Sequence, residues 1–400
     1  MVFCALSKAK GMVILMTEKL YYQDSHMSEF TATVLECRET RGGYAAILDR
    51  TAFFPEGGGQ AADTGYIGAV AVTDVHERSG ELLHYCAGPL KAGEALPCRI
   101  DWEQRLRRMQ NHSGEHIVSG ITHKLHGYEN VGFHMGADCM TIDFDGELDE
   151  AGLREIETLA NQAVRDDIPV RTWFTNAEEL AALDYRSKLE LTENVRIVEI
   201  AGIDRCACCA PHVSRTGEIG VIKLLDAERH RGGMRISLVC GMDALDDYRL
   251  KQDNVTAISR ALSVKRGDTG AAVARVLEEQ RAARERLASL ELELVRFRAE
   301  AVAATDGNIC VFDEVLGEAA QRELVNLLMP KCGGLAAAFC GSDDGGYRYV
   351  IGSRTLDLRR CGKELNALIG GRGGGSSQMI QGRASAAREI VQKVVETAFV

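Results

Sequence analysis

Two pairs of metal-binding residue types share one spacing in this sequence. His112 and His116 lie in the run N-H-S-G-E-H, and Cys208 and His212 lie in the run C-A-C-C-A-P-H. The pairs read H-x3-H and C-x3-H, and three imidazoles with one thiolate form a donor set suited to zinc. The alternative, solvated histidines and an unrelated cysteine cluster that only packs, requires both spacings to coincide by chance. The sequence therefore predicts a single zinc ion held by these four side chains.

The flanking sequence predicts how each pair is held. Residues 103 to 126 are rich in helix formers with apolar residues at helical spacing, so His112 and His116 should lie on one helix face. Pro211 disfavours helix at Ala210. Cys208 to His212 should therefore form a tight loop that closes over this helix, after a buried strand at residues 195 to 200.

Composition limits the class of protein. A chain of 400 residues with 46% apolar content is long enough for two or three cores. No apolar run approaches the roughly 20 residues that span a bilayer. The 13 cysteines are scattered with no secretory segment before them, which predicts reduced thiols in a soluble, cytoplasmic protein.

The net charge of -11 argues against broad electrostatic adhesion to nucleic acid. Two local basic surfaces remain possible on an acidic body. One comprises Arg105, Arg107 and Arg108, and the other lies within residues 351 to 400. For each, an ordinary solvated face is an equally good interpretation.

The patterning predicts an α+β protein with several parts. Residues 1 to 15 read as an extension outside the fold. Residues 16 to 100 alternate apolar and polar side chains, which is typical of a small antiparallel sheet or barrel. Residues 101 to 248 mix helices and strands in an α+β zinc-binding core on which the barrel should pack. Residues 249 to 304 are helical, and residues 305 to 400 read as a C-terminal α/β domain.

Residues 271 to 303 carry an apolar stripe. Apolar residues recur here at alternating intervals of three and four positions, with Gln280 as the one polar exception. They are Val273, Val276, Ala283, Leu287, Leu290, Leu294, Phe297 and Ala301. Such a stripe over about four heptads predicts a coiled-coil seam. Its partner is a second chain or a returning helix, and we favour a homodimer because the stripe must be buried somewhere.

Two glycine runs also stand out. Three glycines follow Pro55 in F-F-P-E-G-G-G-Q and permit a close backbone approach, although a plain hairpin loop is the alternative. The run L-I-G-G-R-G-G-G-S-S-Q-M, at 368 to 379, predicts a loop whose backbone N–H groups could hold phosphate. It matches no P-loop or dinucleotide fingerprint.

Taken in order, four motifs resemble one family. F-F-P-E-G-G-G-Q-A-A-D-T-G, H-S-G-E-H, G-F-H-M-G and C-C-A-P-H-V-S-R-T-G-E-I-G resemble the AlaX proteins, freestanding relatives of the alanyl-tRNA synthetase editing domain. The likeness extends over nearly the whole chain. Residues 16 to about 248 resemble the editing module, and the rest resembles the synthetase's C-terminal domain carried by long AlaX forms. The resemblance implies trans-editing: hydrolysis of serine, and often glycine, wrongly attached to alanine tRNA.

The resemblance implies the zinc ligands His112, His116, Cys208 and His212. The family often has threonine where this chain has Ser113, and G-G-T-H where it has C-A-P-H. The second difference adds Cys209, so Cys206 and Cys209 compete with Cys208 as the thiolate, and only Cys208 keeps the spacing. The resemblance further implies that the C-terminal domain contacts the tRNA body, through Arg372, Gly373, Gly374 and Gly375.

Hydrolysis of an aminoacyl ester needs a positioned water and stabilisation of the oxyanion. Zinc could activate its bound water, but four protein ligands fill a tetrahedral shell. Either a ligand leaves, or substrate adds as a fifth, or zinc organises the pocket for a separately held water. The site must also bind the serine hydroxyl in order to favour serine over alanine. We expect Ser113 and Gln60 to contact that hydroxyl. We expect Glu115 to be a solvated surface carboxylate rather than the base.

Two other functions fit part of the pattern. His112 to His116 also matches H-x-x-E-H, the inverted zinc-protease signature, which makes Glu115 a general base. That interpretation requires a carboxylate third ligand downstream and leaves C-x3-H without a role. The other is a non-catalytic RNA-binding protein with a purely structural zinc ion, which would bind tRNA and leave a serine ester intact.

Overall fold

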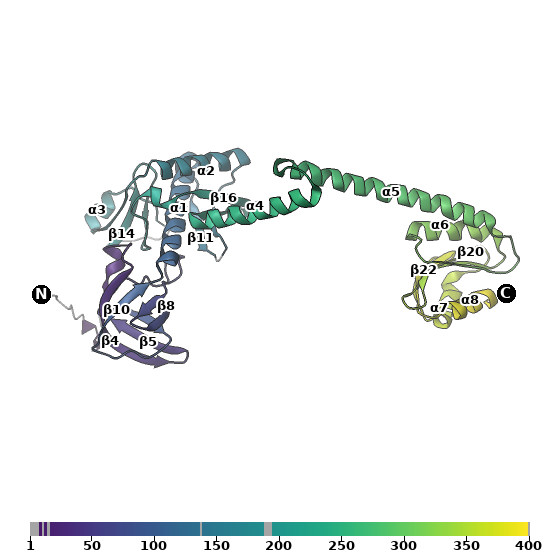
Figure 1. Cartoon of the computed structure of the whole chain (residues 1–400), viewed down its shortest axis with the longest axis horizontal. Helices are drawn as coiled ribbons and strands as arrows, with labels where there is room; N and C mark the ends of the chain where they lie inside the picture. The colour runs from purple at the N-terminus through teal and green to yellow at the C-terminus, as the bar shows by residue number, and fades with distance from the viewer. Residues whose placement is uncertain (1–7, 10–11, 14–16, 137, 188–193, 399–400) are drawn as a thin grey trace. The chain divides into compact units, whose positions relative to one another are not determined.

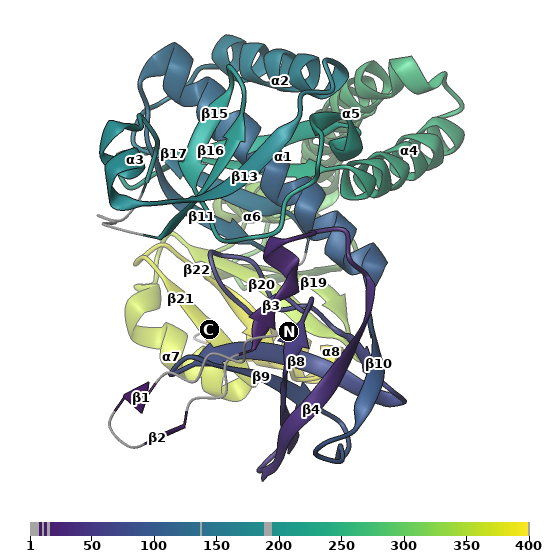
Figure 2. The ribbon, with the colours of Figure 1, turned by 90° about the vertical axis from the view of Figure 1, so that its left-hand side faces the viewer.

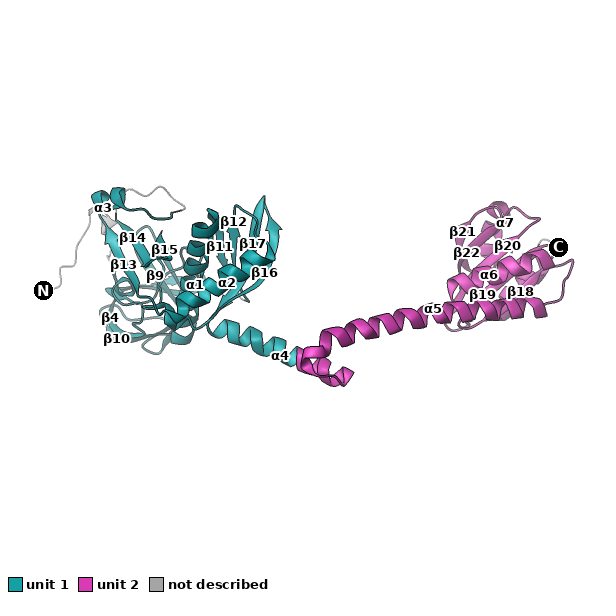
Figure 3. Cartoon of the chain, turned by 90° about the horizontal axis from the view of Figure 1, so that it is seen from above, with its two compact units in different colours: residues 1–254 teal, residues 255–400 magenta. Residues whose placement is uncertain are grey.

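The computed structural model describes residues 8–9, 12–13, 17–136, 138–187 and 194–398 (Figure 1). The chain forms two compact units, residues 1–254 and 255–400 (Figure 3). Helices and sheets occur in both, which confirms the mixed α and β class. Most of the expected extension at residues 1 to 15 lies outside the described residues. Within it, β1 (Lys8–Ala9) pairs with β2 (Met12–Val13).

Six antiparallel strands close a barrel in the segment whose alternating pattern predicts a small sheet or barrel (Figure 2). Their order is β10-β4-β5-β9-β8-β7, with β4 at Glu29–Thr40, β5 at Gly43–Leu48, β7 at Gly65–Ile67, β8 at Val70–Arg78, β9 at Glu81–Cys86 and β10 at Ala95–Ile100. Inward side chains such as Val34, Leu48 and Val75 fill the interior because successive residues of a strand point to opposite faces. Beside the barrel, β3 (Glu18–Lys19) pairs with β6 (Arg50–Thr51), and the short 3-10 helix η1 (Leu20–Tyr22) follows β3.

The rest of unit 1 is built around α1 (Trp102–His126). The Asp101 side chain accepts a hydrogen bond from the Gln104 N–H and caps its start, and Gly127, at φ 72°, ends it in the left-handed region. Around α1 are a four-stranded sheet of order β11-β12-β17-β16, a three-stranded sheet of order β13-β14-β15, and the helices α2, α3 and α4. The bounds are β11 Asn130–Met135, β12 Met140–Phe144, α2 Glu150–Arg165, β13 Val170–Thr175, α3 Ala177–Ala182, β14 Val195–Ile200, β15 Asp204–Ala207, η2 Thr216–Ile219, β16 Ile222–His230, β17 Gly233–Cys240 and α4 Met242–Leu262.

The first of the two possible basic surfaces is largely neutralised by carboxylates. Arg105 is fully buried, and its guanidinium pairs with Asp63 and donates to the Ala52 carbonyl. Arg107 pairs with Asp243 and Asp246. A buried guanidinium must be neutralised and hydrogen bonded, so Arg105 joins the barrel to α1 and presents no charge to solvent.

Unit 2 begins within α4 and continues with the 33-residue helix α5 (Thr269–Ala301). A five-stranded sheet of order β18-β19-β20-β22-β21 follows, in which β18 and β19 are parallel and the other pairs antiparallel. The bounds are η3 Arg266–Asp268, β18 Ile309–Asp313, α6 Glu318–Leu328, η4 Met329–Lys331, β19 Leu335–Ser342, β20 Gly346–Ser353, α7 Leu358–Leu368, β21 Gly371–Gly375, β22 Met379–Ala384 and α8 Arg388–Thr397.

The second glycine run is a strand, which corrects the expected loop. Residues 371 to 375 form β21, the edge of the sheet, in register with β22. A Cβ at Gly373 would lie 2.3 Å from the Gln381 carbonyl oxygen, so glycine permits the close strand approach here. Arg372 and Gly373 to Gly375 are exposed. Among the described residues, no helix is both long and apolar enough to cross a membrane.

Candidate metal centre

Helix α1 carries the first pair of predicted ligands. His112 and His116 are buried, and their ring centroids lie 5.6 Å apart. Residues four apart lie one above the other on a helix. The prediction that both imidazoles point the same way is therefore confirmed.

A loop after β15 carries the second pair. Cys208 to His212 have no regular secondary structure, as the proline predicts. The buried Arg196 guanidinium donates to the carbonyl oxygens of Cys208, at 3.0 Å, and Ala210, at 2.9 Å. The Ser25 hydroxyl donates to the His212 carbonyl at 2.8 Å. These bonds satisfy backbone carbonyls of the turn and tie it to Arg196 of β14 and to Ser25.

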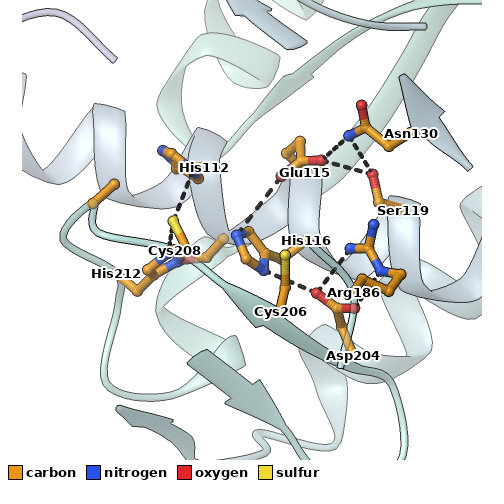
Figure 4. Close-up of polar contacts among 12 residues, drawn as sticks. His112, Glu115, His116, Ser119, Asn130, Arg186, Asp204, Cys206, Cys208 and His212 are labelled. Atoms are coloured by element: carbon orange, nitrogen blue, oxygen red, sulfur yellow. Dashed lines mark hydrogen bonds and ion pairs between the residues drawn. The ribbon is translucent and has the colours of Figure 1, made fainter. Parts of the chain in front are cut away.

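The two pairs converge on one point (Figure 4). One ligand atom each from His112, His116, Cys208 and His212 lies within 4.8 Å of all the others. Cys208 Sγ is 3.5 Å from His112 Nε2 and 3.4 Å from His212 Nε2. The described residues thus form a group that could hold a metal ion, as the spacing predicts. Of the competing thiols, Cys206 lies with His116 and Asp204 in a separate group, and Cys209 is exposed.

Each histidine is oriented by an oxygen on its outer nitrogen. Gln60 Oε1 lies 3.1 Å from His112 Nδ1, Asp204 Oδ2 lies 2.9 Å from His116 Nδ1, and Ser113 Oγ lies 3.0 Å from His212 Nδ1. With Nδ1 occupied, Nε2 is left to face the Cys208 sulfur. Metal-binding histidines are held in this way in general, so the arrangement fits a metal ion.

The electrostatics of the cluster agree with that fit. Burial alone would raise the pKa of the Cys208 thiol, but the neighbouring His112 and His212 outweigh it and hold the pKa well below its usual range. Burial lowers the pKa of His212 to about 3. Burial also opposes the charge on His116, yet its bond to Asp204 raises that pKa well above the usual value. The cluster favours a thiolate with positive charge beside it, an arrangement that a bound cation satisfies.

The two expected substrate contacts lie behind the ligands. Ser113 and Gln60 are fully buried, and each is hydrogen bonded to a histidine. Ser113 Oγ also accepts from the Val213 N–H at 3.2 Å. The structure therefore gives both residues a ligand-orienting position, and their contact with a substrate stays a prediction.

A cavity of about 630 Å³ opens beside the cluster. Its described lining includes His112, His116, Cys208, Phe133 and the turn at Gly58 and Gly59. Gly59 has φ 81°, and a Cβ there would lie 2.7 Å from the Phe133 ring. The first glycine run thus permits a close approach, and it does so within a tight turn closed by Gly57 and Gln60.

Glu115 corrects another expectation. It is only 5% exposed and lines the cavity, so it is not a solvated surface carboxylate. Its Oε1 accepts hydrogen bonds from Ser119 Oγ and Asn130 Nδ2. Glu115 lies about 100 degrees around the helix from His116. It is still buried because other parts of the protein cover α1 on several sides.

The sequence interpretation missed the side chains around the ligands. Asp204 is paired through both oxygens with the Arg186 guanidinium, at 2.8 and 3.0 Å, while it holds His116. Arg196 and Asn130 were missed as well. The only sequence signal for Asp204 and Arg196 is that both lie close to the cysteine run. Neither stands at a fixed spacing from the predicted ligands that metal binding would require.

Several protein families and known proteins are similar to this chain. Residues 195–236 match the "Threonyl and Alanyl tRNA synthetase second additional domain", and residues 8–104 match "tRNA synthetases class II (A)". The alanyl-tRNA editing protein AlaX-L of Pyrococcus horikoshii is 27% identical over 94% of this chain and 96% of its own length. This chain is a homologue of AlaX-L. The resemblance seen in the motifs is thereby confirmed.

Alanine–tRNA ligases also match. That of Halorubrum lacusprofundi is 32% identical over 89% of this chain and 40% of the ligase. The chain spans about two fifths of the length of such ligases. The solved C-Ala domain of Aquifex aeolicus alanyl-tRNA synthetase aligns with 24% of the chain at 22% identity and a TM-score of 0.20, which supports no conclusion about the fold.

Proposed function

We propose that this AlaX-L homologue is a trans-editing hydrolase that removes serine, with glycine as a second candidate, from alanine tRNA at a zinc site. The convergence of His112, His116, Cys208 and His212 beside a cavity carries the proposal. Similarity to an alanyl-tRNA editing protein over nearly the whole of both chains supports the substrate class. The cavity volume of about 630 Å³ falls within the usual range for small-ligand sites, which suits the charged terminal nucleotide of a tRNA.

In this proposal the four residues would hold the zinc ion, which when bound would supply positive charge beside the cavity. Gln60, Asp204 and Ser113 keep the imidazoles turned inward. Arg196 keeps the cysteine loop in place. Phe133 and the glycine turn form part of the cavity wall beside the four side chains.

The C-terminal unit would contact the tRNA body. Arg372 lies exposed on the edge strand β21, followed by Gly373, Gly374 and Gly375. An edge strand presents unpaired backbone groups, and a guanidinium beside it suits phosphate. We also propose that residues 271 to 303 join two chains in a homodimer.

One assay tests the main proposal. Serine, glycine and alanine esters of alanine tRNA are incubated with the protein, with and without a chelator. We expect rapid loss of the serine ester, retention of the alanine ester, and arrest by the chelator that added zinc reverses. Binding of tRNA without ester loss would instead favour the non-catalytic RNA-binding function.

The inverted-protease function has less support. It needs a carboxylate as the third ligand, whereas Cys208 and His212 complete the group around His112 and His116. Peptide hydrolysis abolished by Glu115→Gln, with serine esters left intact, would nevertheless establish it in place of editing.

A further inference from the structure

A buried carboxylate in the cavity is not one of the four predicted metal ligands. Glu115 lines the cavity with His112, His116 and Asn130, and it is only 5% exposed. A buried ionised carboxylate is costly unless it is hydrogen bonded and its charge is paired. The contacts of Glu115 therefore show what a ligand would have to supply.

One of its two oxygens is fully used (Figure 4). Oε1 accepts from Ser119 Oγ at 2.6 Å and from Asn130 Nδ2 at 2.5 Å. Asn130 Nδ2 also donates to Ser119 Oγ at 3.0 Å. These bonds fix both the carboxylate and the orientation of the amide, whose NH₂ must face its two acceptors.

The other oxygen has no donor within hydrogen-bonding distance among the described residues. Its nearest charged partner is His116 Nε2 at 3.8 Å, which is beyond a hydrogen bond. The amide oxygen Oδ1 of Asn130, a residue only 7% exposed, is likewise buried without a partner. Two acceptors on neighbouring side chains therefore lack a donor.

The cations of the cavity wall are engaged elsewhere. Arg186 is bound to both oxygens of Asp204. Arg196 donates to two carbonyl oxygens of the cysteine loop. The second carboxylate of the wall, Glu129, is exposed and lies 3.0 Å from His123 Nδ1. Glu115 is thus a buried carboxylate whose second oxygen accepts no hydrogen bond from the described side chains, with His116 Nε2 as its nearest charged neighbour at 3.8 Å.

We infer that Glu115, with Asn130, binds the α-ammonium group of the aminoacyl ester. The inference rests on the proposed function and adds a specificity-determining residue to it. In an aminoacyl ester the carboxyl group is consumed, so the α-ammonium is the fixed charge that every amino acid retains. It lies two bonds from the reacting carbonyl carbon, and Glu115 lies beside the cluster expected to receive that carbonyl.

This assignment has a consequence for substrate choice. Serine, glycine and alanine all carry the α-ammonium, so Glu115 would not distinguish among them. It would instead exclude N-acylated esters, such as peptidyl-tRNA, because acylation removes the charge and leaves the carboxylate buried and unpaired. The site would then act only on free aminoacyl ends.

The experiment compares two substrates and three proteins. Seryl-tRNA and N-acetylseryl-tRNA, both on alanine tRNA, are given to the full chain, to Glu115→Gln and to the control Glu228→Gln, which changes an exposed carboxylate on β16. We expect the wild type to prefer the free amine, and Glu115→Gln to lose about 10- to 100-fold in kcat/KM on seryl-tRNA alone, as for one charged hydrogen bond. Glu228→Gln should match the wild type.

An equal loss of kcat/KM on both substrates would overturn the inference and make Glu115 a general base. Unchanged kcat/KM on both substrates would also overturn it, because Glu115 would then bind neither. Zinc content and far-UV circular dichroism of each variant report whether the fold is kept, and Asn130→Ala, which should weaken the same preference, provides a second variant.

A binding measurement separates this inference from the proposed function. A non-hydrolysable seryl amide of 3′-amino-3′-deoxyadenosine and its N-acetyl form are titrated against the same three proteins. Tighter binding of the free amine by the wild type, abolished in Glu115→Gln, supports the inference even if no ester is hydrolysed. Equal binding of both compounds by the wild type contradicts it, whatever the hydrolysis assay shows.

Discussion

At the scale of single residues, Asp204 has more influence than its place outside the ligand set suggests. It joins Arg186 to His116 through three contacts, one to the imidazole and two to the guanidinium. Burial raises the pKa of its carboxyl, but His116 and Arg186 outweigh this and lower it. Asp204 is therefore an anion fixed behind a ligand, which increases the basicity of the imidazole.

We expect Asp204→Ala to lower zinc affinity by about 10- to 100-fold, the usual cost of losing a partner of a metal-binding histidine. Competition with a chromophoric chelator measures the affinity. Asp226→Ala, which removes an exposed carboxylate on β16, is the control and should keep the wild-type value. Unchanged affinity in Asp204→Ala would show that the Asp204 contact is unimportant to the metal.

The choice of thiolate is tested by three single variants. Cys208→Ala should lose stoichiometric zinc because its Sγ alone among the three thiols belongs to the four-residue group. Cys206→Ala and Cys209→Ala should retain one ion per chain, measured by atomic emission of the purified protein. Full zinc in the Cys208 variant would show that our assignment is wrong.

The sequence predicted the four converging side chains because their types and spacing are those that a zinc ion would require. It did not predict Asp204, Asn130 or the burial of Glu115. Asp204 is 88 positions from the histidine that it holds, and such pairing depends on which strands pack against α1. Residue type alone also favoured a solvated position for Glu115, since unpaired carboxylates are seldom buried.

At the scale of elements, α1 is held closely against the strands that carry its partners. A Cβ at Gly120 would lie 2.5 Å from the Ile203 carbonyl oxygen and 2.7 Å from Asp204 Cβ. Glycine is poor in a helix interior, and here it permits the approach of β15. The distance between α1 and β15 therefore determines whether Asp204 reaches His116.

We expect Gly120→Ala to displace Asp204 and destabilise unit 1 by about 1 to 3 kcal/mol, as overpacking does, with weaker zinc binding as well. Urea unfolding and zinc titration measure the two effects. Gly202→Ala, in the turn before β15, has open space for its Cβ but a φ of 76°, so it should cost stability through strain while leaving zinc affinity in place.

The barrel contains a buried histidine that links its stability to pH. His84 is fully buried between Thr51 and the Ala46 carbonyl, and burial lowers its pKa to about 4 from an ordinary value of 6.5. The unfolded chain therefore binds a proton more readily than the folded one between these values. The contribution of His84 to the free energy of unfolding is therefore fully present above pH 6.5. It decreases by on the order of 3 kcal/mol as the pH falls towards 4.

Urea unfolding of the wild type from pH 7 to pH 4.5 should show this loss, and His84→Gln should make the loss smaller. His76→Gln, which removes a partly exposed histidine of the same barrel, is expected to keep the wild-type slope. Parallel pH profiles for the wild type and His84→Gln would contradict this role for His84.

Elements with strong periodicity were the easiest to predict. The helix expected at 103 to 126 and the strand expected at 195 to 200 agree with α1 and β14, because apolar spacing determined them. Strand β21 was missed because four of its five residues are glycine, which lacks the side-chain pattern of a strand. Its identity comes from pairing with β22, which no local pattern encodes.

At the scale of the whole molecule, we propose ester hydrolysis for the unit at residues 1–254 and tRNA binding for the unit at residues 255–400. The boundary at residues 254 and 255 divides helix α4. The finer division into parts that we expect from sequence stays a prediction, as does the homodimer. The exposed surface of α5 nevertheless bears on whether the protein forms a homodimer.

Helix α5 presents large apolar side chains to solvent within its own unit. Leu287 is 59% exposed and Phe297 is 70% exposed, while Val295 and Ala299 are buried in the core that includes α6. Apolar surface exposed along about eight turns is costly in water. A second copy of the same helix would cover the stripe at heptad spacing.

We therefore expect the wild type to dimerise reversibly and the double variant Leu287→Glu, Leu294→Glu to be monomeric, since like charges would face each other across the seam. Sedimentation velocity over a range of concentrations measures the association. Arg284→Glu, which changes charge on the same exposed helix without removing an apolar side chain, should remain dimeric. If the wild type sediments as a monomer at every concentration, the stripe has another partner and the coiled-coil interpretation of residues 271 to 303 is wrong.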